Sequence, residues 1–247
     1  MIDMHQAEAV VHLTINRPAK KNALTREMYG LLSRRIREAA GDEAVNAIVI
    51  SGHGNVFTAG NDLDDFRARA TDPNPQPSAG LAFIETLMDC DTPVIAAVEG
   101  IAIGIGTTLL LHCDSVIAGR SATFKTAFVD LGLVPEAAST VTMPLHLGAR
   151  RAAELLLFGE VMDGVEARDC GLVSKVVDDG AAVNAALELA QRLAGKPREA
   201  LRASKRLIRA PWRDQVREAL ERERAVFSER LRSDDCRQAL ARMMERR

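Results

Sequence analysis

The sequence lacks an excess of charge of either sign, and it lacks any hydrophobic run long enough to cross a membrane. Lysine and arginine number 32 against 34 aspartates and glutamates, which leaves a formal charge of −2. This balance provides no basic surface for nucleic acid, and the longest apolar runs fall short of the roughly 18 residues typical of a membrane span. We therefore expect neither nucleic acid nor membrane as a partner, but a small molecule.

The sequence also lacks the cysteine spacings that are typical of metal sites and disulfide frameworks. Its four cysteines are scattered, and none forms a CxxC pair or has a histidine at metal-ligand spacing. The first residues, MIDMHQAEAV, have the character of neither a secretory signal nor a basic presequence. We expect reduced, packed thiols, no bound metal and a cytoplasmic location.

What the sequence does contain is enough hydrophobic residues, 47%, for a large core. Short apolar runs that end in glycine are typical of buried strands in a sheet covered on both faces. Strands are predicted over residues 9–15, 44–52, 93–100 and 114–119. One helix should begin near Thr25 and another should cover residues 79–90. The alternation of strands and helices predicts an α/β fold.

The second half of the sequence becomes increasingly helical. Asp163 and Glu166 have the spacing of a capping box, and Gly171 is a plausible end for that helix. A strand is predicted over residues 172–177, and helices follow from about residue 180, with breaks near residues 195–197 and 210–211. We interpret the proline-rich residues 71–80 as a mobile loop within the first part rather than as a domain boundary.

Two glycine-containing loops could bring backbone close to a ligand. Residues 58–62, TAGND, follow a strand and precede a helix, and Gly104 and Gly106 flank Ile105 at the start of a second helix. Each loop alone could be an ordinary turn, and neither matches a nucleotide-binding pattern. Together they suggest two converging amides, an arrangement that stabilises a carbonyl oxygen as it gains negative charge.

A third segment, residues 124–148, contains one carboxylate of interest, Glu136. In a turn rich in proline and alanine, this acid could simply be exposed. In an apolar cavity, desolvation would instead raise its pKa and make it an effective proton acceptor and donor. We interpret His112 and His146 as packing or surface residues, because no Ser-His-Asp or metal constellation is visible.

These three segments, in this order, resemble the enoyl-CoA hydratase/isomerase (crotonase) superfamily from about residue 10 to residue 178. The resemblance implies an α/β spiral of ββα units, C-terminal helices used in oligomerisation, and homotrimers or dimers of trimers. It divides the chain into an acyl-CoA-binding core, residues 1–190, and a helical region, residues 191–247, that packs on the core or on a neighbouring subunit. It implies an acyl-CoA thioester as substrate, with coenzyme A as part of the substrate and no separate cofactor.

The resemblance also assigns positions in the site. The oxyanion hole would consist of the backbone amides of Asn61 and Ile105. The residues expected to line the bent CoA are Ala59, Gly60, Asn61, Asp62 and Leu63. Lys20 and Lys21 match a region that often lies near the CoA phosphates, although two lysines in a polar loop can also be simply solvated.

Departures from the family pattern narrow the expected reaction. Thr108 and Phe128 stand where the family's hydratases carry two glutamates, so ordinary hydration is disfavoured, and we expect both residues to shape a dry acyl pocket. Glu136 instead matches the acid of the PEG-type motif in peroxisomal-type Δ3,Δ2-enoyl-CoA isomerases. One difference remains, because Ala137 replaces the glycine that usually follows this glutamate.

The expected activity is isomerisation of 3-enoyl-CoA to trans-2-enoyl-CoA in fatty-acid metabolism, with Glu136 moving a proton from C2 to C4. Other reactions of the superfamily remain as alternatives, namely hydration, thioester hydrolysis and dehalogenation. A protein that binds acyl-CoA without catalysis is a further alternative. The sequence does not set the acyl chain length, the pathway, the choice between trimer and hexamer, or whether residues 71–80 cover the site.

Overall fold

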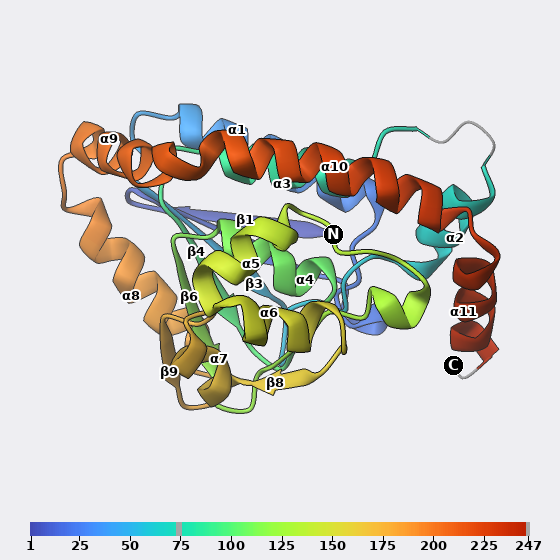
Figure 1. The fold of residues 1–247 in the computed structure, drawn as a ribbon. Coiled ribbons are helices and arrows are strands. Elements are labelled where there is room, and N and C mark those ends of the chain that lie inside the picture. Colours follow the sequence, from blue (N-terminus) through green and yellow to red (C-terminus); the bar gives the residue numbers. More distant parts are fainter. Residues whose placement is uncertain (73–75, 246–247) are drawn as a thin grey trace.

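The computed structural model describes residues 1–72 and 76–245 as a layered α/β arrangement of two sheets and surrounding helices (Figure 1). The strands are β1 Ile2–Ala7, β2 Val10–Ile15, β3 Ala47–Gly52, β4 Val94–Val98, β5 Ile101–Ile103, β6 Ser115–Gly119, β7 Thr123–Lys125, β8 Val161–Asp163 and β9 Lys175–Val177. The helices before residue 150 are α1 Arg26–Gly41, α2 Leu63–Thr71, α3 Ala79–Asp89, α4 Ile105–Thr108, α5 Ser139–Leu147 and α6 Ala149–Leu156. The later helices are α7 Gly164–Cys170, α8 Ala182–Ala194, α9 Arg198–Arg209, α10 Arg213–Leu231 and α11 Asp234–Glu245. Short 3-10 helices are η1 Pro18–Lys20, η2 Leu109–His112, η3 Val129–Leu131 and η4 Ala210–Trp212.

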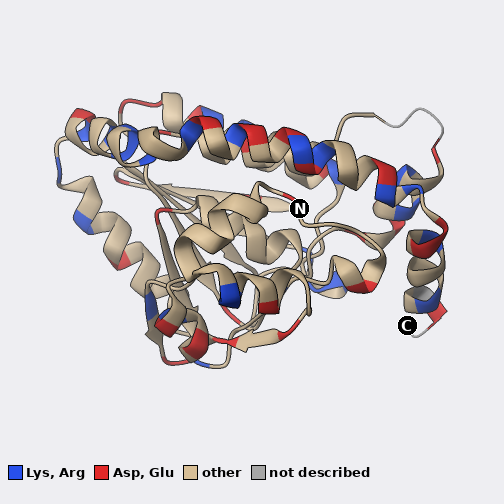
Figure 2. Cartoon of the chain, viewed as in Figure 1, with Lys and Arg blue, Asp and Glu red and all other residues tan. Residues whose placement is uncertain are grey.

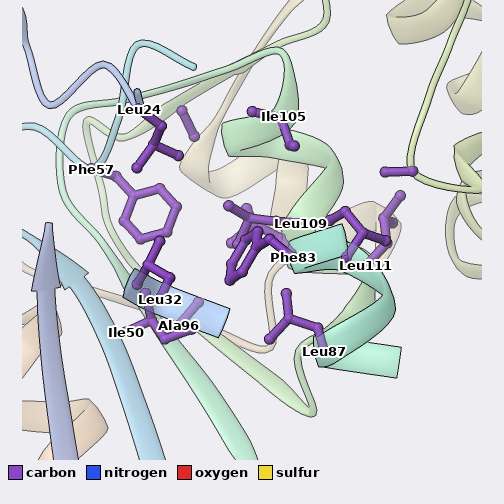
Figure 3. Close-up of a cluster of buried hydrophobic side chains, with 14 of the residues drawn as sticks. Leu24, Leu32, Ile50, Phe57, Phe83, Leu87, Ala96, Ile105, Leu109 and Leu111 are labelled. Carbon is purple, nitrogen blue, oxygen red and sulfur yellow. The ribbon is translucent and has the colours of Figure 1, made fainter. Parts of the chain in front are cut away.

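The larger sheet has the order β1-β2-β3-β4-β6-β9 and is parallel apart from the β1–β2 hairpin. Its central strands β3 and β4 are buried along nearly their whole length because helices cover both faces. One face packs with α1 and α3 in the main core, where Phe57, Phe83 and Leu109 meet (Figure 3). Alanines of α8 cover the other face.

A second, smaller sheet has the order β5-β7-β8. The chain passes from β4 of the large sheet to β5 of the small one, and from β6 to β7, so the two sheets grow together from turn to turn. Helices complete each turn, as α1 does after the β1–β2 pair and α4 after β5. The result is the expected α/β spiral of ββα units.

The last helices pack against the rest of the chain. Helix α8 crosses residue 190, the boundary drawn from the sequence, and its buried alanines contact the large sheet. Helix α10 is long and carries alternating basic and acidic side chains on its surface (Figure 2). It contacts α5, and α11 returns to contact α2. None of the described helices is long and apolar enough to cross a membrane.

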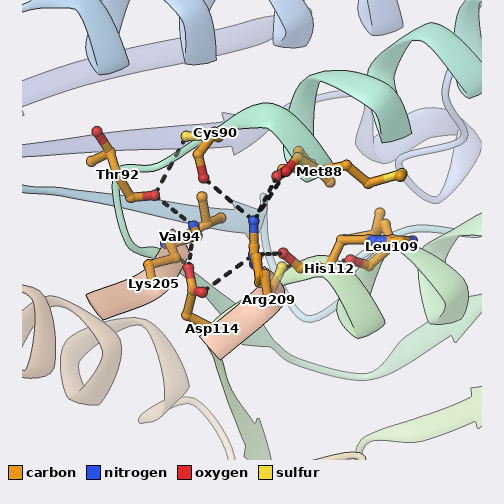
Figure 4. A network of polar contacts seen from close by, with 11 residues as sticks. Met88, Cys90, Thr92, Val94, Leu109, His112, Asp114, Lys205 and Arg209 are labelled. Atoms are coloured by element: carbon orange, nitrogen blue, oxygen red, sulfur yellow. Dashed lines mark hydrogen bonds and ion pairs between the residues drawn. The ribbon is translucent and has the colours of Figure 1, made fainter. Parts of the chain in front are cut away.

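Two basic side chains attach α9 to the core (Figure 4). The ammonium of Lys205, which is only 6% exposed, donates to the carbonyl of Thr92 at 2.8 Å and to the Asp114 carboxylate at 2.5 Å. Arg209 donates to the same carboxylate at 3.2 Å and to the carbonyl of His112 at 2.8 Å. Burial lowers the pKa of Lys205, and the charge of Asp114 offsets only part of this effect. The paired charges therefore fix α9 beside the start of β6.

Several expectations about elements need correction. The sequence patterns missed β1, whose residues are mostly exposed, and the three-residue strands β5, β7 and β8, which are too short to show alternation. They also missed α5 and α6. The strand predicted over residues 172–177 begins only at Lys175, because the amides of Leu172 and Val173 donate to the Ala167 carbonyl at the end of α7.

The loop expected over residues 71–80 lies partly outside the described residues, which omit 73–75. In its described part, Thr71 ends α2 and Ala79 begins α3, with the Ser78 hydroxyl accepting a hydrogen bond from the amide of Leu81.

We expect Lys205→Ala to lower the free energy of unfolding by about 2 kcal/mol, because the substitution removes the buried partner of Asp114, which keeps its contact with Arg209. Urea denaturation followed by circular dichroism measures this value. Arg206→Ala is the matched control, because Arg206 lies on the same helix as Lys205, is half exposed and pairs with Asp91. This substitution should lower the free energy of unfolding by less than about 1 kcal/mol. Equal losses in both variants would contradict the proposed role of Lys205.

Candidate active site

Backbone hydrogen bonds join the two glycine-containing loops that the sequence singles out. The amide of Thr58 donates to the Ile101 carbonyl at 3.0 Å, and the amide of Ile103 donates to the Thr58 carbonyl at 3.1 Å. Thr58 thereby forms a parallel bridge with Ala102 at the edge of the small sheet. Each loop leaves this bridge in the same direction, so the two turns that follow lie side by side.

Glycine is required where these two turns meet. Gly60 has a φ of +85°, and a Cβ atom there would lie 2.5 Å from the Ile103 carbonyl oxygen and 3.9 Å from the Ile105 nitrogen. Gly104 has a φ of +58° and directly precedes α4. Among the described residues, no hydrogen bond occupies the amides of Asn61 and Ile105. The structure therefore brings two free amides close together, as an oxyanion hole requires.

Asn61 and Ile105 are held in place in different ways. The Ile105 side chain is buried in the main core, so only its amide is available to a ligand. Asn61 is held on both sides, because the Leu24 amide donates to the Gly60 carbonyl at 2.8 Å and the Asp62 amide donates to the Leu24 carbonyl at 2.9 Å. The amide that would face a ligand is thus fixed by its neighbours in the chain.

Tyr29, which the sequence analysis did not single out, completes this part of the site. Its hydroxyl donates to the Asn61 side-chain oxygen at 2.8 Å, and its ring lies 5.8 Å from that of Phe83. Burial raises the pKa of Tyr29 well above its usual value, and the charge of Glu136 adds to this effect. A single tyrosine on the buried face of α1 resembles an ordinary core residue, so only the folded chain distinguishes it.

Asp62 has a structural role at the start of α2. Its carboxylate accepts hydrogen bonds from the amides of Asp64 and Asp65 at 3.0 and 3.2 Å and pairs with Arg17 at 2.6 Å. Burial alone would raise its pKa, but Arg17 and the two amides lower it below the usual range. Asp62 is therefore a charged helix cap in the wall of the site.

Glu136 is buried rather than exposed, with 6% of its surface accessible. The hydroxyl of Thr108 donates to its Oε1 at 3.1 Å. The pKa of Glu136 is raised to about 7, and desolvation is the largest cause. The hydrogen bond from Thr108 and, more weakly, the charge of Arg69 lower this pKa, whereas the charge of Glu223 raises it. A carboxyl group with this pKa can both accept and return a proton near neutral pH.

The turn that carries Glu136 is held in an unusual conformation. Ala137 and Ala138 have φ values of +64° and +56°, in the left-handed region that favours glycine. The alanine that departs from the family motif therefore keeps the glycine-like geometry, at a cost on the order of 1 kcal/mol. The Nε2 of His112 donates to the Ala137 carbonyl at 2.8 Å. Burial lowers the pKa of His112 to about 4, so the ring is neutral and supports the turn without adding charge.

A cavity of about 270 Å³ opens between α1, α2, the start of α3 and α10, with Glu136 in its wall. The rings of Phe66 and Phe227 meet edge to face across it, with centroids 6.1 Å apart. Its further lining includes Leu24, Arg26, Tyr29, Asn61, Asp62, Asp65, Arg69, Leu81 and Arg224. The cavity thus places Asn61, the candidate base and apolar side chains around one space.

The other residues expected in the site, Ile105 and Thr108 among them, are not part of the wall of this cavity. Phe128 is buried immediately before η3, and Leu63 packs in the main core. Lys20 and Lys21 are exposed in and after η1, and the Lys21 carbonyl accepts the amide of Ala59 at 2.9 Å. The lysines therefore adjoin the Ala59 turn but stay outside the cavity.

The residues that sequence reasoning missed are those contributed by distant helices. Arg69 and Phe66 come from α2, and Arg224 and Phe227 come from α10. The one available signal was the helical spacing that puts Phe66 and Arg69 on the same face of α2. Nothing in the sequence indicates that α10 lies against that face.

The chain matches a known enzyme family over nearly its whole length. Residues 5–247 match the enoyl-CoA hydratase/isomerase family, and the chain belongs to it. The chain is 34% identical to 1,2-epoxyphenylacetyl-CoA isomerase of Escherichia coli, with 98% of this chain and 95% of the relative covered. It is also 34% identical to rat enoyl-CoA delta isomerase 2, covering 96% of this chain and 62% of that protein. A relative with a hydratase name matches at similar identity.

Solved structures agree with this assignment. Pseudomonas aeruginosa OdaA superposes with a TM-score of 0.94 at 40% identity, and the match covers 98% of both chains. The crotonase fold expected from the sequence is therefore confirmed, and the chain is a crotonase-type acyl-CoA enzyme.

The burial of Glu136 should be visible in the pH dependence of stability. Its pKa rises from 4.5 in the unfolded chain to about 7 on folding, so its ionisation opposes folding progressively between these pH values. We expect Glu136→Gln to raise the free energy of unfolding by up to about 3 kcal/mol at pH 8, with little change near pH 4. Urea denaturation at both pH values measures the difference.

Glu43→Gln, at an exposed position, is the control for this measurement and should show no such pH-dependent gain. Equal stability of wild type and Glu136→Gln at pH 8 would show that the folded protein does not penalise the charged form of Glu136.

Proposed function

We propose that this protein moves the double bond of 3-enoyl-CoA thioesters to the trans-2 position. The observation that carries the proposal is a single buried carboxyl group with a pKa near 7, Glu136, in the cavity bordered by Asn61. The similarity to enoyl-CoA delta isomerase 2 supports it. One carboxylate and an oxyanion hole suffice for this reaction, so the proposal includes no metal or organic cofactor.

The mechanism follows from the positions of these groups. The amides of Asn61 and Ile105 would donate hydrogen bonds to the thioester carbonyl oxygen and stabilise the negative charge that forms on it. The Glu136 carboxylate would then remove a proton from C2, and the electrons would delocalise over a dienolate extending to C4. The protonated Glu136 would return that proton to C4, which leaves the double bond between C2 and C3 and regenerates the carboxylate.

Hydration would need groups that hold a water molecule and manage its protons. Thr108 has its hydroxyl hydrogen-bonded to Glu136, and Phe128 is buried. Neither residue supplies a second carboxylate at the positions where the family's hydratases carry one, which supports isomerisation over hydration for this chain.

The test incubates the purified protein with cis-3- and trans-2-enoyl-CoA and follows double-bond migration and hydration separately. We expect migration to dominate, and we expect Glu136→Gln to lower its kcat by about 10²- to 10⁴-fold, because the amide cannot accept the proton. Binding of a saturated acyl-CoA should remain in that variant. Hydration without migration, or undiminished migration in Glu136→Gln, would refute the proposal.

The pH profile provides a second test. We expect kcat/KM for migration to fall below pH 7, because the free enzyme must hold Glu136 as a carboxylate. Thr108→Val removes a hydrogen bond that stabilises the charged form, so the acidic limb should move to higher pH. An unchanged limb in Thr108→Val would contradict the assigned contact.

We further propose that the chain assembles as a trimer or dimer of trimers through the outer face of α9 and η4. Leu207 and Ile208 are both 74% exposed there, and Trp212 is 43% exposed. They border a hollow of about 1080 Å³ that also includes Leu111 and Val216. Exposed apolar side chains grouped in this way are typical of a protein interface.

Light scattering coupled to gel filtration tests this assembly. Leu207→Asp together with Ile208→Asp should convert the assembly to smaller species, because each substitution places a charge in an apolar contact. Val226→Asp, at an exposed apolar position of α10 outside this hollow, is the control and should leave the mass unchanged. A wild-type protein that is already monomeric would refute the proposed interface.

A further inference from the structure

The cavity that holds Glu136 is poorly matched to a plain hydrocarbon chain, because three arginines lie in its wall. Arg26 comes from α1, Arg69 from α2 and Arg224 from α10. Guanidinium groups remain charged at any physiological pH and are costly to place beside apolar atoms without partners. Each of these arginines is therefore expected to have a hydrogen-bond or ion-pair partner, either in the chain or in a ligand.

Two of the three arginines have partners within the chain. Arg26 donates from Nη1 to the Pro77 carbonyl at 2.9 Å, and Arg224 donates from Nη1 to the Glu221 carboxylate at 3.0 and 3.2 Å. Arg69 differs from both. Over residues 1–72 and 76–245, its half-buried guanidinium makes no hydrogen bond or ion pair, and its Nε is buried without a partner.

The charges around Arg69 do not compensate it. Burial lowers its pKa first, and the neighbouring Arg26, Arg224 and Arg232 lower it further, while Glu136 is the one carboxylate acting in the opposite sense. Glu136 makes its hydrogen bond to Thr108 and keeps a raised pKa near 7 despite Arg69. Arg69 therefore is not the ion-pair partner that holds Glu136 ionised.

The acidic residues of the cavity wall are also engaged elsewhere. Asp62 caps α2 and pairs with Arg17, and Asp65 accepts the backbone amide of Arg26 at 2.8 Å. Asp72 also lines the cavity, and it has an interaction of its own. Among the residues that the structure describes, Arg69 is the one charged group of the cavity wall without a hydrogen bond or ion pair, so it can bind a ligand that brings its own negative charge.

The position of Arg69 relative to the oxyanion hole suggests which part of the ligand carries this charge. Asp62, Phe66 and Arg69 have the spacing of one helical face, and all three line the cavity. Asp62 adjoins the Asn61 amide, and Arg69 lies about 10 Å farther along α2. A group bound at Arg69 is therefore separated from the thioester by the length of a short acyl chain.

We propose that the substrates are CoA thioesters whose acyl group ends in a carboxylate, and that Arg69 binds this carboxylate. The phenylalanines of α2 and α10 contact the methylene segment between the two polar ends. The reaction assigned to these substrates rests on the proposed isomerase function, whereas the binding preference does not.

Isothermal titration with saturated analogues tests the preference without turnover. Wild type should bind adipoyl-CoA roughly ten- to a hundred-fold more tightly than hexanoyl-CoA, the range for a hydrogen-bonded charge pair. Arg69→Met should reduce this ratio to about one, and Arg69→Lys should keep part of it. Arg222→Met, on the exposed face of α10, is the control and should keep the full ratio. Thermal melting checks that each variant is folded.

Two results would overturn the proposal. Equal affinity of wild type for the two thioesters would remove the carboxylate preference, and this result does not depend on any variant. A loss of affinity in Arg69→Met that is the same for free CoA and for both thioesters would assign Arg69 to the CoA phosphates instead.

Activity assays separate this inference from the proposed function. Migration of 3-hexenoyl-CoA with no preference for the carboxylated analogue would refute the inference and leave the isomerase proposal standing. A clear preference in binding with no migration of either substrate would refute the isomerase function and leave the binding site standing.

Discussion

The geometry of the candidate site depends on the backbone pairing between Thr58 and the β5 segment. These hydrogen bonds place the Ala-Gly turn beside the Gly-Ile-Gly turn, and they form only because the facing positions carry no side chain. A Cβ atom at Gly106 would lie 2.6 Å from the Cγ2 of Thr58, and one at Gly60 would meet the Ile103 carbonyl oxygen. A methyl group at either position would push the two loops apart and separate the amides of Asn61 and Ile105.

Glu136 shows how this scaffold supports a group that would otherwise be unstable in its place. Its carboxyl group is almost completely desolvated, and the two alanines after it occupy left-handed conformations. The surrounding structure maintains both features, through His112 on the Ala137 carbonyl and through Glu223 of α10, which accepts the amide and the hydroxyl of Thr140. Helix α10 thus contributes to the candidate site by fixing the turn that carries Glu136.

The sequence alone predicted those helices and strands that have a strong local signature. The apolar runs identified β2, β3, β4 and β6, and the capping residues Thr25 and Asp163 correctly marked the starts of α1 and α7. The expectation failed for β1, which is a mostly polar edge strand, and for β5, β7 and β8, whose three residues are held by pairing partners far away in the chain. Such short strands exist because of tertiary contacts rather than intrinsic preference.

The sequence by itself determined the fold family, the two glycine turns and the candidate proton acceptor, Glu136, because these depend on residue types at fixed local spacing. Only the tertiary structure decided that Glu136 is buried against Thr108, which lies 28 residues earlier, and that Tyr29 contacts Asn61 across 32 residues. It also decided that Arg69, which has no hydrogen bond or ion pair within residues 1–72 and 76–245, lines the same cavity. Burial and charge environment arise from the packing of α1, α2 and α10 around one space, and no short stretch of sequence encodes that arrangement.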